Sequence, residues 1–264
     1  KWKTAEIKIN KINCIDMGLS YRKKNYCLPD RIRSYFANYI QKIFLFFWSS
    51  IMITVFQNEK FSIRKAILGS FENNCYIIEC AVTKSLMVID APIGIGQVFS
   101  SLDVSKIRYL LISHGHFDHI DGLAEIRSDL QNVVIGIDNK DAETLIVDQV
   151  DFLKDSQIVE NGKLEIKVLS TPGHTFGSVC FLLNDHLFSG DTLFPGGPGR
   201  TDSKSSFECI LDSINKKIMN LPETTQIHPG HGISANLKNE KKQYLGFIQT
   251  HYQDRDNVFG HVSW

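Results

Sequence analysis

The densest group of chemically active residues is the stretch HGHFDHIDG at positions 114–122, with three histidines and two aspartates in nine positions. His114 and His116 are two residues apart, so in an extended segment both side chains project to the same side and can bind one ion. Asp118 and His119 follow where the chain turns into an expected helix, so they can face a second ion. A polar loop with an N-capping aspartate is the alternative for this stretch alone.

Three further polar residues follow apolar runs in the same way. His174 lies in STPGHTFGS, Asp191 in FSGDTLF and His231 in HPGHG. The glycines beside them let the backbone turn sharply and approach closely, and strand-end loops that converge on one edge of a sheet commonly carry active sites. Together the four segments predict a metal centre rather than a set of structural turns. His186 and His228 are outside the pattern. His186 lies in a predicted hairpin turn and is expected to be solvent-exposed or structural, and His228 is expected to be a strand-end residue.

Apolar runs separated by polar or glycine-containing breaks predict the elements that position these residues. Strands are predicted over residues 52–56, 61–69, 74–82, 85–92, 107–113, 132–138, 164–171, 178–184, 186–191 and 225–230. Helical spacing predicts helices over residues 97–103, 122–130, 139–153, 207–221 and 239–252. Strands and helices mix in two similar halves, which indicates an α/β domain with two sheets covered by helices.

With Asp90 in VIDAP placed ahead of them, these segments resemble, in order, the five motifs of the metallo-β-lactamase-fold hydrolases, over roughly residues 61–232. The stretches NCYII, TPGHTFGS, SGDTLFPGGPGRTD and PGHG look most like the glyoxalase II branch, the hydroxyacylglutathione hydrolases and their shorter relatives. The resemblance implies an αββα sandwich of two mixed β-sheets flanked by helices.

The same resemblance implies a role for each site residue. The first metal would be held by His114, His116 and His174, the second by Asp118, His119 and His231, and Asp191 would bridge them, so that Asp118 and Asp191 are the catalytic carboxylates. Asp90 would orient ligand histidines from behind, as such partners commonly do. Arg200, in GRTD, is expected either to pair with a substrate carboxylate or to pin the FPGGPG loop.

Nitrogen and oxygen ligands suit Zn²⁺ as well as Fe or Mn, and two divalent ions, zinc by default, are expected. A water between two cations has its pKa lowered from about 16 to about 7, and the resulting bridging hydroxide would attack a carbonyl while one metal stabilises the oxyanion. A thioester suits this chemistry, because a thiolate leaves without a strong proton donor. The expected substrate is therefore a small molecule, with a hydroxyacylglutathione as the first candidate.

Other reactions remain open at this point. A persulfide dioxygenase of the same fold would use one iron held by His114, His116 and Asp191, with His174 not ligating. Those enzymes usually have GCGRTD where this chain has GPGRTD, which argues mildly against one. Ester, lactone and phosphoester hydrolases also share the fold. Thirty-three residues follow His231, so the helical domain with which full-length glyoxalase II binds glutathione is expected to be absent.

Charge is unevenly placed along the chain. Residues 1–42 carry ten Lys/Arg against three Asp/Glu, a net +7, and because the whole chain is neutral, residues 43–264 carry −7. A nucleic-acid-binding main body is not indicated. Six cysteines without a CxxC pair favour a reducing, cytoplasmic compartment.

The run IFLFFWSSIMITVF at 43–56 is a candidate for membrane contact or an anchor. It reaches only sixteen uncharged residues even when extended to Asn58, and roughly 20 are needed to cross a bilayer. The favoured interpretation is an N-terminal extension over residues 1–51, basic and then apolar, followed by a hydrolase domain over residues 52–264 whose first strand is MITVF.

Overall fold

The computed structural model describes residues 52–147, 149–251 and 259–264. All of them belong to one unit, Phe47–Trp264. The expected N-terminal extension and most of the apolar run lie outside the described residues, so the proposed domain boundary stays a prediction. Within the described part of the chain, no helix is both long enough and apolar enough to span a membrane.

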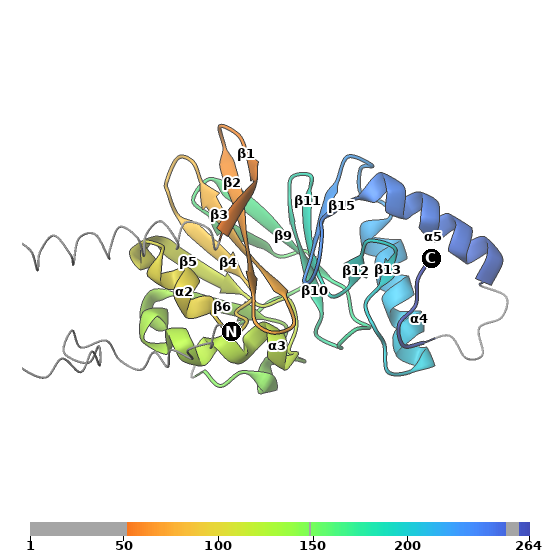
Figure 1. Cartoon of the computed structure of the whole chain (residues 1–264), viewed down its shortest axis with the longest axis horizontal. Coiled ribbons are helices and arrows are strands. Elements are labelled where there is room, and N and C mark those ends of the chain that lie inside the picture. Colours follow the sequence, from red (N-terminus) through yellow and green to blue (C-terminus); the bar gives the residue numbers. More distant parts are fainter. Residues whose placement is uncertain (1–51, 148, 252–258) are drawn as a thin grey trace, which may run out of the picture. The chain divides into compact units, whose positions relative to one another are not determined.

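The first sheet has seven strands in sequence order (Figure 1). They are β1 (Met52–Gln57), β2 (Phe61–Leu68), β3 (Asn73–Cys80), β4 (Leu86–Ile89), β5 (Ile107–Leu111), β6 (Val134–Ile137) and β7 (Asp151–Phe152). Neighbours from β1 to β4 are antiparallel, and those from β4 to β7 are parallel. The sheet is therefore mixed, and the carboxyl ends of its parallel strands β4 and β5 lie at one edge.

The second sheet has six strands in the order β15-β14-β11-β10-β9-β8. They are β8 (Ile158–Asn161), β9 (Leu164–Ser170), β10 (Val179–Leu183), β11 (His186–Gly190), β14 (Gln226–Pro229) and β15 (Ala235–Asn236). Only β11 and β14 are parallel to each other, so this sheet is mixed too. A small ribbon of β12 (Leu193–Phe194) and β13 (Gly197–Pro198) follows β11.

The two sheets pack face to face, and helices cover their outer faces, as Figure 1 shows for α2 (Ile95–Ser100) and for α4 (Lys204–Ser213) and α5 (Leu237–His251). Strand alternation explains the layers, because Ile77 packs against the α2 side while its neighbour Ile78 faces the second sheet. Likewise Phe188 lies between the sheets and Leu187 packs against α4 and α5. The expected αββα sandwich is confirmed.

Shorter helical segments complete the chain. They are α3 (Phe117–Ile120), the 3₁₀ helices η1 (Val104–Lys106), η2 (Asp121–Asn132) and η3 (Ala142–Thr144), and the π-helix η4 (Ile214–Ile218), which continues α4. The prediction of a helix over residues 139–153 was wrong, because the described residues of this segment form only η3 and the short strand β7. Val147 and Val150 have helix-like spacing, but they pack on the core from backbone that is not helical.

Candidate metal centre

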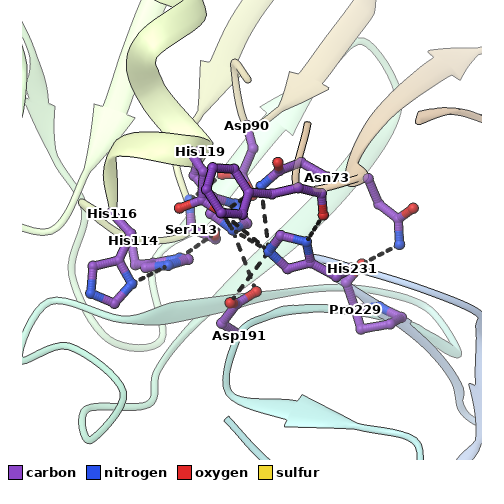
Figure 2. Close-up of polar contacts among 12 residues, drawn as sticks. Asn73, Asp90, Ser113, His114, His116, His119, Asp191, Pro229 and His231 are labelled. Atoms are coloured by element: carbon purple, nitrogen blue, oxygen red, sulfur yellow. Dashed lines mark hydrogen bonds and ion pairs between the residues drawn. The ribbon is translucent and has the colours of Figure 1, made fainter. Parts of the chain in front are cut away.

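The polar residues singled out in the sequence come together at one edge of the sandwich. Asp90 follows β4, Asp191 follows β11 and His231 follows β14, while the 114–119 segment follows β5. Figure 2 shows these side chains pointing toward one another from both sheets. Glycine is needed here, because a Cβ on Gly230 would lie 2.2 Å from Asp191 Oδ1.

A first group of potential ligand atoms comprises His114, His116 and His174, whose ligand atoms all lie within 4.8 Å of one another. His114 Nε2 is 3.1 Å from His116 Nδ1. His174 Nδ1 donates a hydrogen bond to the Arg200 carbonyl oxygen at 2.7 Å. Its Nε2 is then a buried lone pair without a hydrogen-bond partner, which a cation would satisfy.

The second group comprises Asp118, His119 and His231. His231 Nδ1 donates to the Phe71 carbonyl oxygen at 2.8 Å, and His119 Nδ1 binds Asp90 Oδ2 at 2.8 Å. With both Nδ1 atoms committed, the two Nε2 atoms face each other at 3.2 Å. Two neutral imidazoles held this way would direct lone pairs at each other, and a shared cation removes that conflict.

Asp191 lies between the two groups. Its Oδ2 is 3.6 Å from both His174 Nε2 and His231 Nε2, and its Oδ1 is 3.5 Å from His119 Nε2. With His114 and His119 it also forms a third group of potential ligands. Oδ1 is buried without a hydrogen-bond donor. A buried carboxylate oxygen without a partner is costly, and cations on both sides of Asp191 would satisfy it.

At His114, His116 and Asp118, electrostatics favour the protonation states that metal ligands need. Burial and the neighbouring histidines hold the pKa of His114 well below its usual value, and burial also lowers that of His116. Burial would raise the pKa of Asp118, but hydrogen bonds from His231 and Asn73 lower it overall. For His119, burial lowers the pKa, yet Asp90, Asp191 and Asp118 raise it to about 9. The carboxylates thus favour positive charge at this position, either a proton or a metal ion.

Asp90 lies directly behind the centre and is 1% exposed. Its Oδ1 accepts from the Ser113 backbone N–H at 2.7 Å, and Oδ2 accepts from Ser113 Oγ at 2.9 Å as well as binding His119. Its φ of 63° is in the left-handed region, which is rare for a residue other than glycine. Such strain persists where the surroundings require it, here to orient His119.

Two positioning residues were missed by the sequence analysis. Asn73 Nδ2 donates to Asp118 Oδ2 at 2.9 Å. The buried Asp141 carboxylate accepts from the N–H groups of Gly115 and Gly177 and from the Thr175 hydroxyl, at 2.8, 2.9 and 2.6 Å. It therefore joins the loop of His114 and His116 to the loop of His174. A polar residue just ahead of NCYII was the only signal for Asn73, and Asp141 gave none.

Arg200, His186 and His228 are not among the potential metal ligands of the described residues. Arg200 pairs with Asp202 at 2.8 Å and is exposed, so its side chain is engaged within its own loop. His186, expected at a hairpin turn, is a buried residue at the start of β11. Its Nδ1 is 3.0 Å from Nε2 of the buried His228, and neither belongs to a group of potential metal ligands among the described residues.

Residues 68–231 match the model of the metallo-beta-lactamase superfamily, and the chain belongs to this superfamily. It is 33% identical to a probable polyketide biosynthesis zinc-dependent hydrolase, BaeB, of Bacillus velezensis, over 72% of this chain and 91% of that protein. It is 31% identical to a hydroxyacylglutathione hydrolase of Pelagibacter ubique, over 71% of this chain and 75% of the relative.

Among solved structures, a metallo-beta-lactamase from Staphylococcus aureus superposes with a TM-score of 0.65 at 27% identity, over 75% of this chain and 66% of that one. Together with the clustered histidines and aspartates, these similarities define a metal-dependent hydrolase. The seven ligand candidates suit zinc and do not by themselves select it over iron or manganese.

Proposed function

We propose that this protein binds two divalent metal ions and hydrolyses thioesters. The observation that carries the proposal is the placement of Asp191 between two groups of ligand atoms, each with three members. The zinc-dependent and hydroxyacylglutathione hydrolases among the relatives support it. A hydroxyacylglutathione is the first candidate substrate.

The residues assigned to the two ions are those that the sequence pattern suggested. His114, His116 and His174 would hold one ion, Asp118, His119 and His231 the other, and Asp191 both. Bound there, two cations would lower the pKa of water and polarise the substrate carbonyl. Asp118, kept ionised by its neighbours, can accept a hydrogen bond from the attacking water and orient it. Asp90 keeps the ring of His119 in place.

A thioester fits because the leaving thiol has a pKa of about 8.5 and departs as a thiolate without a strong acid beside it. A persulfide dioxygenase would leave His174 outside the metal shell. The buried, unpartnered Nε2 of His174, with Nδ1 committed to Arg200, supports a ligand role instead.

The test combines metal analysis with two assays on the purified protein, one with S-D-lactoylglutathione and one with glutathione persulfide and O₂. We expect two metal ions per chain and thioester cleavage. Asp191→Asn should bind fewer ions and lose at least about 100-fold in kcat/KM, because it weakens both groups. Asp185→Asn, at an exposed carboxylate near His186, is the matched control and should retain both the bound metal ions and the parent kcat/KM. One iron per chain with O₂ consumption and no thioester cleavage would contradict the proposal.

A further inference from the structure

Four large apolar side chains on or beside the candidate metal-binding segments are exposed to solvent. Phe71, Phe117, Phe176 and Ile233 have exposed fractions of 55%, 56%, 72% and 75%. We call these four residues the apolar rim. Single exposed apolar residues are ordinary on protein surfaces, whereas a set gathered at one site marks a place where apolar material binds.

Each member of the rim is tied to a ligand residue. Phe117 lies between His116 and Asp118 in the chain, and Phe176 and Ile233 each follow a ligand histidine by two residues. Phe71 comes from the turn before β3, and its carbonyl oxygen accepts the hydrogen bond from His231 Nδ1 at 2.8 Å. Three members of the rim therefore lie on the loops that carry the candidate ligands, and the fourth, Phe71, is hydrogen-bonded to one of these ligands. The rim thus borders the place where a carbonyl would react.

Part of the rim forms a packed surface. The rings of Phe71 and Phe117 meet edge to face with centroids 5.4 Å apart, an arrangement that aromatic pairs prefer. These residues come from different parts of the chain, so their contact is a product of the fold. The half-buried Phe194 ring lies 6.4 Å from that of His231, whose Nδ1 is hydrogen-bonded to the Phe71 carbonyl oxygen. A substrate bound here meets preformed aromatic surface beside the second group of ligands.

Two cationic side chains that could instead bind a charged substrate near these loops are already engaged. The Arg200 guanidinium pairs with Asp202. The ammonium of Lys65 donates to the Gly232 carbonyl oxygen at 3.1 Å, in a residue that is 7% exposed. Neither is arranged to bind the carboxylates of a short, polar acyl or peptidyl group.

We propose that the apolar rim binds the acyl chain of the substrate, and that the protein prefers thioesters of apolar acyl groups, aliphatic or aromatic, over short hydroxyacyl groups. This inference rests on the proposed thioesterase function, because it takes the reacting carbonyl to lie at the metal centre. The part of the acyl group beyond the carbonyl then lies over the side chains that border the ligands.

The experiment compares straight-chain acyl thioesters of N-acetylcysteamine, from acetyl to octanoyl, with the metal-loaded full chain. In parallel, binding is measured for analogues in which a methylene replaces the thioester sulphur. We expect kcat/KM and affinity to rise about two- to fourfold per methylene, since a buried methylene contributes at most about that much. In the double variant Phe71→Ser and Phe176→Ser, kcat/KM and affinity should rise less with each added methylene than in the parent protein. Phe152→Ser, at a residue of β7 that is 54% exposed, is the matched control and should keep them.

The outcomes separate the two proposals. No cleavage of any thioester would sink the proposed function, while the analogues would still show whether affinity rises with chain length. Cleavage and binding that do not depend on chain length would overturn the rim assignment alone. So would a dimer that dissociates in the double variant, because the rim would then bind a second copy of the chain, or equal effects of the double variant and Phe152→Ser.

Discussion

At the scale of single residues, Asp141 is the clearest positioning residue behind the metal ligands. Its carboxylate accepts three hydrogen bonds that join the loop of His114 and His116 to the loop of His174. Asp141→Asn keeps the size but turns one acceptor oxygen into a donor that faces N–H groups. We expect the metal dissociation constant to rise about 10- to 100-fold, as for other residues that orient ligands. Competition with a chromophoric chelator measures it.

The control is Asp138→Asn. Asp138 is also buried, with 9% exposed, and accepts a hydrogen bond within the same loop, from the Lys140 N–H. Among the described residues, its carboxylate accepts no hydrogen bond from either ligand loop. Far-ultraviolet circular dichroism and thermal unfolding should show both variants folded. Equal loss of metal affinity in the two variants would mean that Asp141 stabilises the loop in general and does not position ligands.

The sequence predicted the ligand candidates and not these supports, for a physical reason. His114, His116, Asp118 and His119 share one short segment, and together with His174, Asp191 and His231 at the ends of other apolar runs they indicate a metal site. Asp141 meets Gly177 across 36 positions of the chain, and a Cβ on Gly177 would lie 2.5 Å from the Asp141 carboxyl carbon. That fit exists only after the sheets have packed, and no local pattern reveals it.

At the scale of elements, β11 and β14 hold a buried histidine pair between the sheet layers. His186 Nδ1 is 3.0 Å from His228 Nε2, and His228 Nδ1 is 3.1 Å from Ser234 Oγ. The ring of His186 packs on Phe56 of the first sheet, with centroids 4.2 Å apart. Burial, His186 and Lys65 lower the pKa of His228 to about 3, and burial lowers that of His186.

This pair should make the stability of the fold depend on pH. The native pKa of His228 is below the unfolded value of about 6.5, so the unfolded chain binds protons first as the pH falls. The stability that comes from keeping the pair neutral is complete above about pH 6.5 and is lost progressively toward about pH 3. For the metal-free protein, His228→Gln should reduce the slope of unfolding free energy against pH, by up to about 1.4 kcal/mol per pH unit. Urea titrations from pH 7 to 4 measure it.

His261→Gln, at an exposed histidine, is the control and should leave the slope as it is in the parent protein. An unchanged slope in His228→Gln would show that the pair accepts a proton without cost.

The elements themselves were largely predictable where burial alternates along a strand, as in β2 and β9. Between β6 and β7 the helical spacing of the apolar residues predicted a helix that the described residues do not form. Contacts of Asp141 and of the apolar core determine the backbone conformation there.

At the scale of the whole domain, the metal centre joins the two sheets. His114, His116, Asp118 and His119 follow β5 of the first sheet, while His174, Asp191 and His231 follow strands of the second. The Nε2 atoms of His119 and His231 are 3.2 Å apart. In the metal-free protein these two rings attract each other only if one of them is protonated, so that its N–H donates to the other. Metal bound by these candidate ligands would therefore cross-link the two sheets as well as take part in the reaction.

Removing the metal should lower the melting temperature. A ligand at about 100 times its dissociation constant stabilises the folded state by about 2.7 kcal/mol, and each kcal/mol shifts the melting temperature of a domain this size by about 2–4 °C. We expect chelation to lower it by roughly 5–10 °C and added Zn²⁺ to restore it. Calorimetry with and without chelator measures the shift.

His231→Gln should reduce the change in melting temperature on chelation, because the second group then lacks a ligand. His261→Gln, at an exposed histidine, should show the same change as the parent protein. A melting temperature insensitive to both chelator and Zn²⁺ would show that the sheets are held by their own packing alone.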